Sequence, residues 1–420
     1  MRRPVGDADV SIQTALTDRR KIFSTGRTRS VAWRVQQLRA IERMCTEQEA
    51  AITSALESDL GRPAMDAWLG DILPTKTEAA YARKRVHKWS RRRRVSVPAS
   101  QQPARAWIQY APKGVVLIIG PWNYPFYLTM APVVSAIAAG NAVVIKPSEL
   151  APATSELIAR LVPQYLDVDA VTVMEGDAET TQQLLAQGFD HVLFTGGTEV
   201  GREIMTAAAS TLTPVTLELG GKSPAIVARD ADIKIAARRI AHTKFINSGQ
   251  TCIAPDYILV EKQVAETFVG QLVSSIKDFQ SEPSLPIVNA RQFERLTTAI
   301  ERTTGRVVAG GGVDRRALRI EPTVIVGPAP DDAVMTAELF GPILPIISVE
   351  SVDDAVDFVN DRPKPLALYV FSRSEFYARE IINRTDSGGA VINHAVVHCL
   401  VPQLPFGGIG ASGMGAYHGW

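Results

Sequence analysis

The fold is decided by an uncharged run that opens with Gly114-Val-Val-Leu-Ile-Ile-Gly120 and closes with Ala142-Val-Val-Ile145. Such a run is long enough to span a bilayer if it were all helix. It is broken by residues that end or kink helices, namely Pro121, Asn123, Pro125, Pro132 and Gly140. We therefore expect strand, turn, helix and strand inside an α/β core, and no membrane span.

Outward from this run, apolar stretches of strand length alternate with helical segments. In the first half of the chain they cover 115–120, 142–146, 171–174, 191–194 and 215–219. A second series covers 224–227, 257–260, 322–326, 343–349 and 367–371. Apolar strands spaced by helices predict parallel sheets covered on both faces. The sequence thus predicts a Rossmann-like nucleotide-binding domain and a second α/β domain, joined at Gly220-Gly221.

The segment before residue 114 is predicted to be mainly helical. Apolar side chains follow a helical stripe over 31–56, at Val35, Leu38, Ile41, Cys45, Ile52 and Leu56, so Cys45 is interpreted as a packing residue. A second, charge-rich helical stretch over 64–89 leads into Arg91-Arg-Arg-Arg94, interpreted as a solvated helix end and linker. After the linker 95–102, the alternating Trp107-Ile-Gln-Tyr110 predicts a hairpin strand.

Composition excludes several classes of function. The chain has 420 residues, 46% of them hydrophobic, and a formal net charge of +1. This balance gives no global attraction to nucleic acid or to membrane surfaces. The three cysteines cannot form a disulfide framework, and the N-terminus lacks the apolar core of a signal peptide. We expect a cytoplasmic protein in a reducing compartment.

The reaction is predicted to occur in the stretch Thr243-Lys-Phe-Ile-Asn-Ser-Gly-Gln-Thr-Cys-Ile-Ala-Pro-Asp-Tyr257. Gly249 and Pro255 bracket Cys252 in a short polar loop between a helical run and a strand. A loop thiol can be reached by a substrate, whereas a core thiol cannot. Cys252 is therefore the candidate nucleophile.

Two further stretches are candidates for nucleotide binding. Phe194-Thr-Gly-Gly-Thr-Glu-Val-Gly201 follows a strand and opens a helix, where backbone N–H groups hold phosphate. The turn departs from the usual three-glycine pattern, and such a turn also occurs without a ligand. Lys146-Pro-Ser-Glu149 stands at the end of a neighbouring strand, where open α/β sheets bind ligands. A solvated loop is the alternative interpretation of these residues.

Taken together and in order, these pieces and five other motifs resemble the NAD(P)-dependent aldehyde dehydrogenase family. The others are Gly120-Pro-Trp-Asn-Tyr-Pro125, Leu217-Glu-Leu-Gly-Gly-Lys-Ser-Pro224, Glu338-Leu-Phe-Gly-Pro342, Pro405-Phe-Gly-Gly408 and Ser412-Gly-Met-Gly-Ala-Tyr-His-Gly419. The resemblance covers nearly the whole chain. It is closest to the class 3 branch, which includes fatty- and aromatic-aldehyde dehydrogenases.

The resemblance implies an oxidoreductase with a catalytic trio. Cys252 matches the family nucleophile, which forms a thiohemiacetal and then a thioester with the aldehyde carbon. Asn123 matches the side-chain donor to the oxyanion, acting with the backbone N–H of Cys252. Glu218 matches the base that activates water to hydrolyse the thioester, and its position between two leucines predicts a raised pKa.

The resemblance also implies a binding site for NAD or NADP, without deciding between them, and no metal. Lys146 and Glu149 would hold the adenosine ribose and Glu338 the nicotinamide ribose. The rest of the implied site comprises Trp122, Thr195, Gly196, Gly197, Val200, Leu219, Gly220 and Phe340.

Five residues are candidates for the walls of the aldehyde tunnel. Tyr124 and Leu128 are four residues apart on one predicted helix, and His242 and Ile246 are four apart on another, so each pair would share a helix face. Thr251 is the fifth candidate. Most are apolar, which favours medium- or long-chain aliphatic or aromatic aldehydes. His242 and His394 depart from the branch, and each is interpreted as a satisfied surface histidine. His398 and Cys399 are neighbours on a predicted strand, so they would point to opposite faces and form no catalytic pair.

The expected domains are a cofactor-binding domain of residues 1–93 and 112–220, a catalytic domain of residues 221–400, and bridging segments 94–111 and 401–420. Members of the branch usually continue into a tail that pairs with the hairpin and with a second subunit. We therefore expect a homodimer that the absence of this tail would weaken, and an aldehyde as the small-molecule partner. Two alternatives stay open. One is a CoA-acylating semialdehyde dehydrogenase, against which Glu218 argues because such an enzyme needs no base to activate water. The other is a non-catalytic nucleotide-binding protein, against which the presence of all three residues of the catalytic trio argues.

Overall fold

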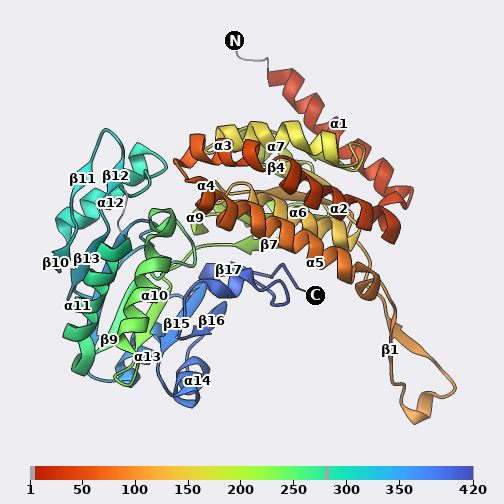
Figure 1. Ribbon diagram of the computed structural model, residues 1–420. Helices are drawn as coiled ribbons and strands as arrows, with labels where there is room; N and C mark the ends of the chain where they lie inside the picture. Colours follow the sequence, from red (N-terminus) through yellow and green to blue (C-terminus); the bar gives the residue numbers. More distant parts are fainter. Residues whose placement is uncertain (1–4, 280–282, 420) are drawn as a thin grey trace.

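The structure, a computed structural model, describes residues 5–279 and 283–419. The chain forms two large sheets, each covered by helices, as the sequence predicted (Figure 1). Within the part of the chain that the structure describes, we find no helix with both the length and the apolar character needed to cross a membrane.

The first sheet has the strand order β17-β7-β6-β3-β4-β5, parallel throughout except for β17. Its strands are β3 Val115–Ile119, β4 Ala142–Lys146, β5 Val171–Val173, β6 His191–Thr195, β7 Val215–Glu218 and β17 Gly413–Met414. The uncharged run 114–145 thus folds as β3, α6 Tyr127–Ala139 and β4, which confirms the α/β interpretation.

Helices cover both faces of this sheet because the side chains of a strand alternate between faces. Val116 and Ile118 of β3 pack toward one helical layer, while Val115, Leu117 and Ile119 pack toward the other. The first layer is built from α2 Val31–Glu47, α3 Glu49–Leu60, α5 Leu73–Trp89, α6 and α7 Pro152–Tyr165. The second is built from α1 Val5–Ser24, α8 Ala178–Ala186 and α9 Thr198–Ala209.

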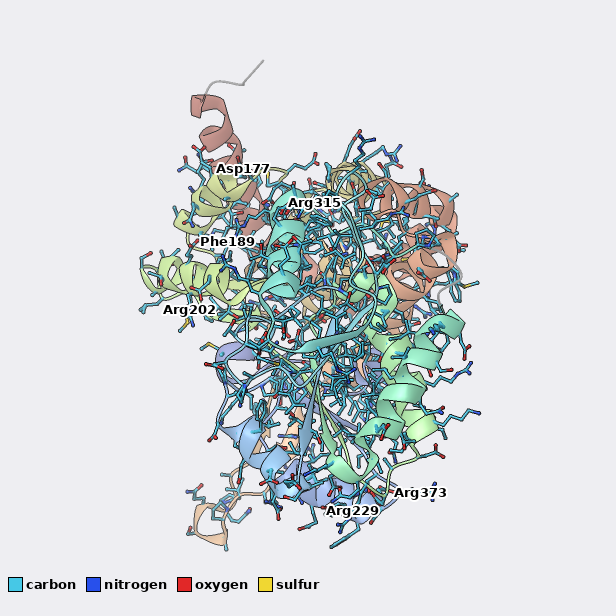
Figure 2. The ribbon with its side chains drawn as sticks, turned by 90° about the vertical axis from the view of Figure 1, so that its left-hand side faces the viewer. Asp177, Phe189, Arg202, Arg229, Arg315 and Arg373 are labelled. Atoms are coloured by element: carbon cyan, nitrogen blue, oxygen red, sulfur yellow. The ribbon has the colours of Figure 1, made fainter. Side chains whose placement is uncertain are left out.

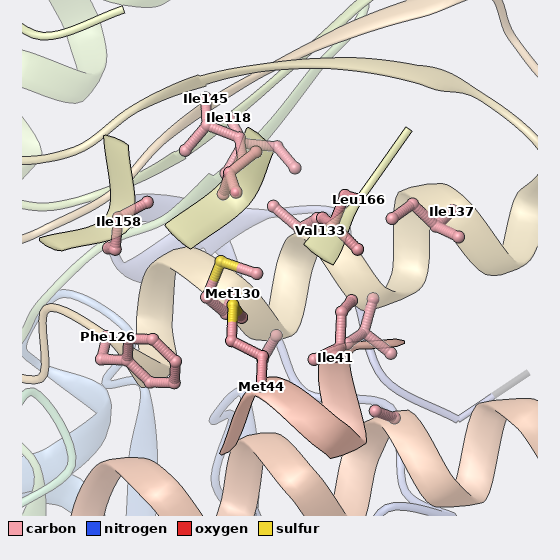
Figure 3. Packing of buried hydrophobic residues seen from close by; sticks show 14 of the residues in the cluster. Ile41, Met44, Ile118, Phe126, Met130, Val133, Ile137, Ile145, Ile158 and Leu166 are labelled. Carbon is pink, nitrogen blue, oxygen red and sulfur yellow. The ribbon is translucent and has the colours of Figure 1, made fainter. Parts of the chain in front are cut away.

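Figure 3 shows the core beneath the first helical layer, where Ile41 and Met44 of α2 meet Met130 of α6. Cys45, one residue further on, is fully buried, so its interpretation as a packing residue is confirmed. The predicted single stripe over 31–56 is wrong in one respect. The stretch forms two helices, because Gln48 interrupts it between the end of α2 at Glu47 and the start of α3 at Glu49.

The second predicted stretch, 64–89, is helical but irregular. It comprises the short α4 Ala64–Ala67, the π-helical η2 Trp68–Ile72 and then α5. The arginine run after it is not simply a helix end, because Arg93–Val95 form β1, which pairs with β2 Ala106–Ile108. This hairpin extends away from both sheets (Figure 1).

The second sheet has the order β10-β13-β14-β9-β8-β15-β16, in which only β10 runs antiparallel among the strands that the structure describes. Its strands are β8 Pro224–Val227, β9 Tyr257–Glu261, β10 Arg306–Ala309, β13 Thr323–Val326, β14 Ile343–Val349, β15 Ala367–Phe371 and β16 Gly389–Ile392. A small hairpin, β11 Val313–Asp314 and β12 Arg319–Ile320, lies outside it.

Two helical layers again enclose the sheet. One contains α10 Ile233–Phe245 and α11 Lys262–Phe279. The other contains α12 Ala290–Arg302, α13 Val352–Asn360 and α14 Glu375–Asn383. Gly220-Gly221 lies between β7 of the first sheet and β8 of the second.

The second sheet presents the amino ends of its strands to the first domain. Arg229 follows β8 and Arg373 follows β15, and both lie at the end of the molecule remote from Asp177, which precedes α8 (Figure 2). The carboxyl ends of the second sheet therefore point away from the first domain. Segments that follow strands of the first sheet consequently meet segments that precede strands of the second.

Candidate active site

The loop that carries Cys252 is held in an unusual backbone conformation. After α10, Asn247 and Ser248 adopt positive φ angles of 53° and 51°, and Gly249 follows at 72°. A Cβ on Gly249 would lie 2.2 Å from the carbonyl oxygen of Gly341, so only glycine fits there. Cys252 follows in a turn before β9 and is partly exposed, as expected for a thiol that a substrate can reach.

Asn123 reaches this loop from the other domain. Its side chain is 4% exposed, and Nδ2 donates to the carbonyl oxygen of Gln250 at 3.1 Å. In return, Nδ2 of Asn247 donates to the carbonyl oxygen of Asn123, also at 3.1 Å. These two bonds cross the interface between the turn after β3 and the Cys252 loop. The amide of Asn123 is therefore fixed beside the candidate nucleophile.

Glu218 ends β7, where Gly413 of β17 pairs with it. Its side chain is 3% exposed, and neither carboxylate oxygen has a hydrogen-bond partner among the described residues. Burial without compensation disfavours the charged form, and it raises the pKa of Glu218 well above its ordinary value. A buried carboxyl group with no structural partner and a raised pKa has the properties of a general base working near neutral pH.

The surroundings of Cys252 disfavour the thiolate form of its side chain. Burial raises the pKa of Cys252, and the nearby carboxylates of Glu338 and Glu218 raise it further. A thiol becomes a strong nucleophile only as the thiolate. The site therefore needs a base to accept the proton, and two carboxylates act on this thiol electrostatically.

Glu338 lies against the join between the domains. A Cβ on Gly220 would come within 2.0 Å of Oε2 of Glu338, so a side chain at position 220 would displace this carboxyl group. Burial raises the pKa of Glu338 to about 8, and the negative charge of Asp256 is the second cause of this rise. The backbone around Glu338 is held by Arg295, whose Nη1 donates to the Glu338 carbonyl oxygen at 3.1 Å.

The predicted cofactor residues gather along the carboxyl edge of the first sheet. Nζ of Lys146, buried at the end of β4, lies 2.6 Å from Oε2 of Glu149. Thr195 ends β6 with its buried hydroxyl unpartnered within residues 5–279 and 283–419. A Cβ on Gly197 would meet no described atom within 4 Å, so this turn before α9 has free space.

These features suit a dinucleotide. The turn opens a helix of 12 residues, α9, whose N-terminal N–H groups favour an anionic group. Val200 in its first turn is exposed, and Leu219 and Gly220 are buried between this turn and Glu338. The rings of Trp122 and Phe340 meet edge to face at 5.4 Å. Most of the predicted cofactor residues thus lie after strands of the first sheet, whereas Glu338 and Phe340 come from the segment before β14 of the second sheet.

The predicted substrate residues are only partly brought together. Tyr124 donates to or accepts from Thr251, with 2.9 Å between their hydroxyl oxygens. Leu128 is buried in the first core. His242 and Ile246 are exposed. The predicted common helix faces are wrong in detail, because Tyr124 precedes α6 and Ile246 follows α10.

Sequence reasoning missed several residues around the site. Arg62 and Asp71 form a buried ion pair behind Asn123, and Asn247 and Gln250 build the Cys252 loop. Cys399 packs against the same hydrophobic cluster as Cys252. The strand predicted around His398 and Cys399 is wrong, because Val397–Leu400 form a 3-10 helix, η5. None of these contacts has a local sequence pattern.

The raised pKa of Glu218 predicts an effect on stability. At pH values between the unfolded pKa of about 4.3 and the raised folded pKa, the free energy of unfolding falls by about 1.4 kcal/mol for each unit by which the pH rises. Glu218→Gln cannot ionise, so we expect it to unfold at a higher temperature than the wild type at pH 7 to 8. The difference should shrink as the pH is lowered to 5. Thermal unfolding curves across this range measure it, and a difference independent of pH would contradict the buried, uncompensated carboxyl group.

Comparison with known proteins agrees with this geometry. The family model described as the aldehyde dehydrogenase family matches residues 4–420. The rat "Aldehyde dehydrogenase, dimeric NADP-preferring" is 45% identical over 97% of this chain and 91% of its own length. The mouse "Aldehyde dehydrogenase family 3 member A2" is 46% identical over 95% of this chain and 84% of its own length. A substrate-bound structure of Staphylococcus aureus AldH superposes with a TM-score of 0.94, at 41% identity, over 97% of this chain and 90% of that one.

Proposed function

Because this chain belongs to the aldehyde dehydrogenase family, we propose that its site oxidises an aldehyde through a covalent intermediate on Cys252. The overall activity is the NAD(P)-dependent oxidation of aldehydes to carboxylic acids. The observation that carries the assignment of residues is the meeting of Asn123, Glu218 and Cys252 at one interface.

The first step is attack of Cys252 on the aldehyde carbon. The thiol gives its proton to a nearby base, and Glu218, whose carboxylate oxygens have no hydrogen-bond partner among the described residues, is the candidate that we propose. A new C–S bond forms and the carbonyl π electrons move to oxygen, giving a thiohemiacetal oxyanion. The side-chain N–H of Asn123 and the backbone N–H of Cys252 stabilise that charge.

The oxyanion then collapses to a thioester as hydride leaves the same carbon. When bound, the dinucleotide supplies the hydride acceptor. Lys146 and Glu149 are proposed to hold its adenosine ribose, and Glu338 its nicotinamide ribose. The turn before α9 would hold the phosphates, with Thr195, Leu219 and Phe340 around the nicotinamide. NAD and NADP both fit this proposal.

The last step is hydrolysis of the thioester. Glu218 in its ionised form takes a proton from water, the hydroxide adds to the acyl carbon, and the C–S bond breaks. The products are the carboxylic acid and the free cysteine. A raised pKa makes the Glu218 carboxylate a stronger base than an exposed carboxylate would be. It also means that a larger share of Glu218 is protonated, and so inactive as a base, as the pH falls.

Several finer points are proposals from the sequence. We propose medium- or long-chain aliphatic or aromatic aldehydes, a homodimer, and the domain bounds 1–93 with 112–220, 221–400, and bridging segments 94–111 and 401–420. The three cysteines are unpaired, which suits the reducing cytosol that we propose as the compartment.

The proposal is tested by purified protein with NAD or NADP and a panel of aldehydes, following nicotinamide reduction with and without CoA. Free acid should appear and CoA should not raise the rate. An acyl-CoA product would favour the CoA-acylating alternative, and no reduction with any aldehyde would favour a non-catalytic protein.

Asn123→Ala tests the oxyanion assignment. Removing one such donor typically lowers the rate on the order of a hundredfold or more. We expect that loss in the single-turnover rate of nicotinamide reduction, with the affinity for the dinucleotide unchanged. Stopped-flow absorbance gives the first quantity and protein fluorescence the second. An unchanged single-turnover rate would show that Asn123 is a turn residue only.

A further inference from the structure

A buried ion pair stands directly behind the loop that carries Asn123. Arg62, just after α3, is 1% exposed, and Asp71 of η2 is fully buried. Nη1 of Arg62 donates to Oδ2 of Asp71. Charged side chains are rarely buried so completely, because each must leave water. Buried ion pairs often contribute no more stability than well-packed apolar residues would, so we look for a role of this pair besides stability.

Asp71 holds one end of the Asn123 loop. Its Oδ1 accepts the backbone N–H groups of Phe126 and Tyr127, at 3.1 and 2.8 Å. Tyr127 is the first residue of α6, so the carboxylate sits where a helix has unpaired N–H donors and favours negative charge. The position of α6 relative to η2 is thereby set by Asp71.

Arg62 holds the other end. Its Nη2 donates to the carbonyl oxygen of Asn123 at 2.5 Å, and its guanidinium lies 4.4 Å from the ring centroid of Tyr124. The hydroxyl of Tyr124 in turn contacts Thr251, the neighbour of Cys252. The same carbonyl of Asn123 accepts from Asn247. Backbone and side-chain contacts thus lead from Arg62 to both sides of the proposed oxyanion hole.

We propose that Arg62 and Asp71 are positioning residues for the oxyanion donor. The pair holds the backbone between Asn123 and Tyr127 so that the Asn123 amide faces the Cys252 loop. This inference rests on the proposed function, because it assigns the pair a role in the same site. Neither residue touches the thiol.

The test is Arg62→Lys, which keeps the positive charge but cannot bond Asp71 and Asn123 in the same fork geometry. A displacement of about 1 Å in a catalytic group lowers rates on the order of a hundredfold. We expect a fall of roughly tenfold to a hundredfold in the single-turnover rate of nicotinamide reduction. Affinity for the dinucleotide, measured by fluorescence, should stay unchanged.

The matched control is Arg83→Lys. Arg83 pairs with Glu42 across α5 and α2 in the same helical layer, and its side-chain hydrogen bonds go to Glu42 and not to the Asn123 loop. It should leave the single-turnover rate unchanged. An equal loss in both variants would overturn the positioning role, because any weakened ion pair would then have the same effect.

A double-mutant cycle with Asn123→Ala separates positioning from stability. If Arg62 acts through Asn123, then Arg62→Lys should add little to the loss already caused by Asn123→Ala. Multiplicative losses in the double variant would overturn the proposal. Should Arg62→Lys not fold, the uncharged pair Arg62→Met with Asp71→Asn takes its place in the cycle. In this pair of substitutions, the side-chain oxygen of the asparagine at position 71 can still accept hydrogen bonds from the N–H groups of Phe126 and Tyr127.

Hydrogen exchange tests the clamp without any turnover. The amides of Phe126 and Tyr127 should exchange faster in Arg62→Lys than in the wild type, whereas Arg83→Lys should leave them protected. Unchanged protection would overturn the clamp. If the wild type oxidised no aldehyde, the proposed function would fail, yet the exchange measurement would still report on the pair.

Discussion

Replacing Cys252 by alanine is expected to lower aldehyde oxidation by roughly 10⁴-fold or more, because the reaction loses its covalent step. Hydrolysis of a simple ester by the same thiol should disappear with it. The reason lies in the placement of Cys252, which is partly exposed beside Asn123 and within the electrostatic influence of Glu218 and Glu338. Steady-state assays with an aldehyde and with an ester measure the two activities.

The control for this variant is Cys45→Ala. Cys45 is fully buried in α2, and burial raises the pKa of its thiol to about 12. It should leave both activities intact. Cys399→Ala is the more demanding comparison, since Cys399 lies near Cys252. We expect its chemical step to be largely intact, and retained turnover in Cys252→Ala together with loss in Cys399→Ala would move the nucleophile to η5.

Glu218→Gln is expected to keep the first hydride transfer and lose the steady state. The glutamine has nearly the same shape but cannot take a proton from water, so the thioester forms and is not cleared. General-base catalysis typically contributes on the order of a hundredfold to ten-thousandfold. We therefore expect a burst of reduced nicotinamide, about one per active site, followed by turnover reduced by that factor.

Two measurements make this result decisive. Mass spectrometry after the burst should find the acyl group on the peptide that contains Cys252. Wild-type steady-state turnover should also fall as the pH is lowered through the raised pKa of Glu218, because the protonated carboxyl is no base. A steady state in Glu218→Gln equal to the wild type would show that another group or bulk water hydrolyses the thioester.

The parts of the fold that follow from local pattern were predictable. The strands β4, β8, β14 and β15 have the predicted bounds, since each is a short apolar run bounded by residues that end strands. The positions of Cys252, Asn123 and Glu218 were predicted by motif, and the raised pKa of Glu218 by its apolar neighbours. These predictions need only residues close in sequence.

Other features depend on contacts between distant segments and were not predictable in this way. Arg62 and Asp71 belong to no sequence motif, and their contacts with the distant Asn123 loop appear only in the folded chain. The segment before Tyr417 is rich in glycine and lacks strand pattern, yet Gly413 pairs with Glu218. The strand predicted at 397–400 is a 3-10 helix because this chain leaves the edge of the second sheet there.

The pairing of β17 with β7 has a consequence for biosynthesis. Strand β7, Val215–Glu218, is made nearly 200 residues before β17, Gly413–Met414, which follows every other strand in the described chain. Until then, the newly made first domain exposes the edge next to Glu218, and an open edge invites pairing with other chains. A nascent chain released before Gly413 would therefore lack the strand that flanks Glu218, the residue proposed as general base. Among the strands that the structure describes, the pairing of β17 with β7 is thus the last that synthesis of the chain allows.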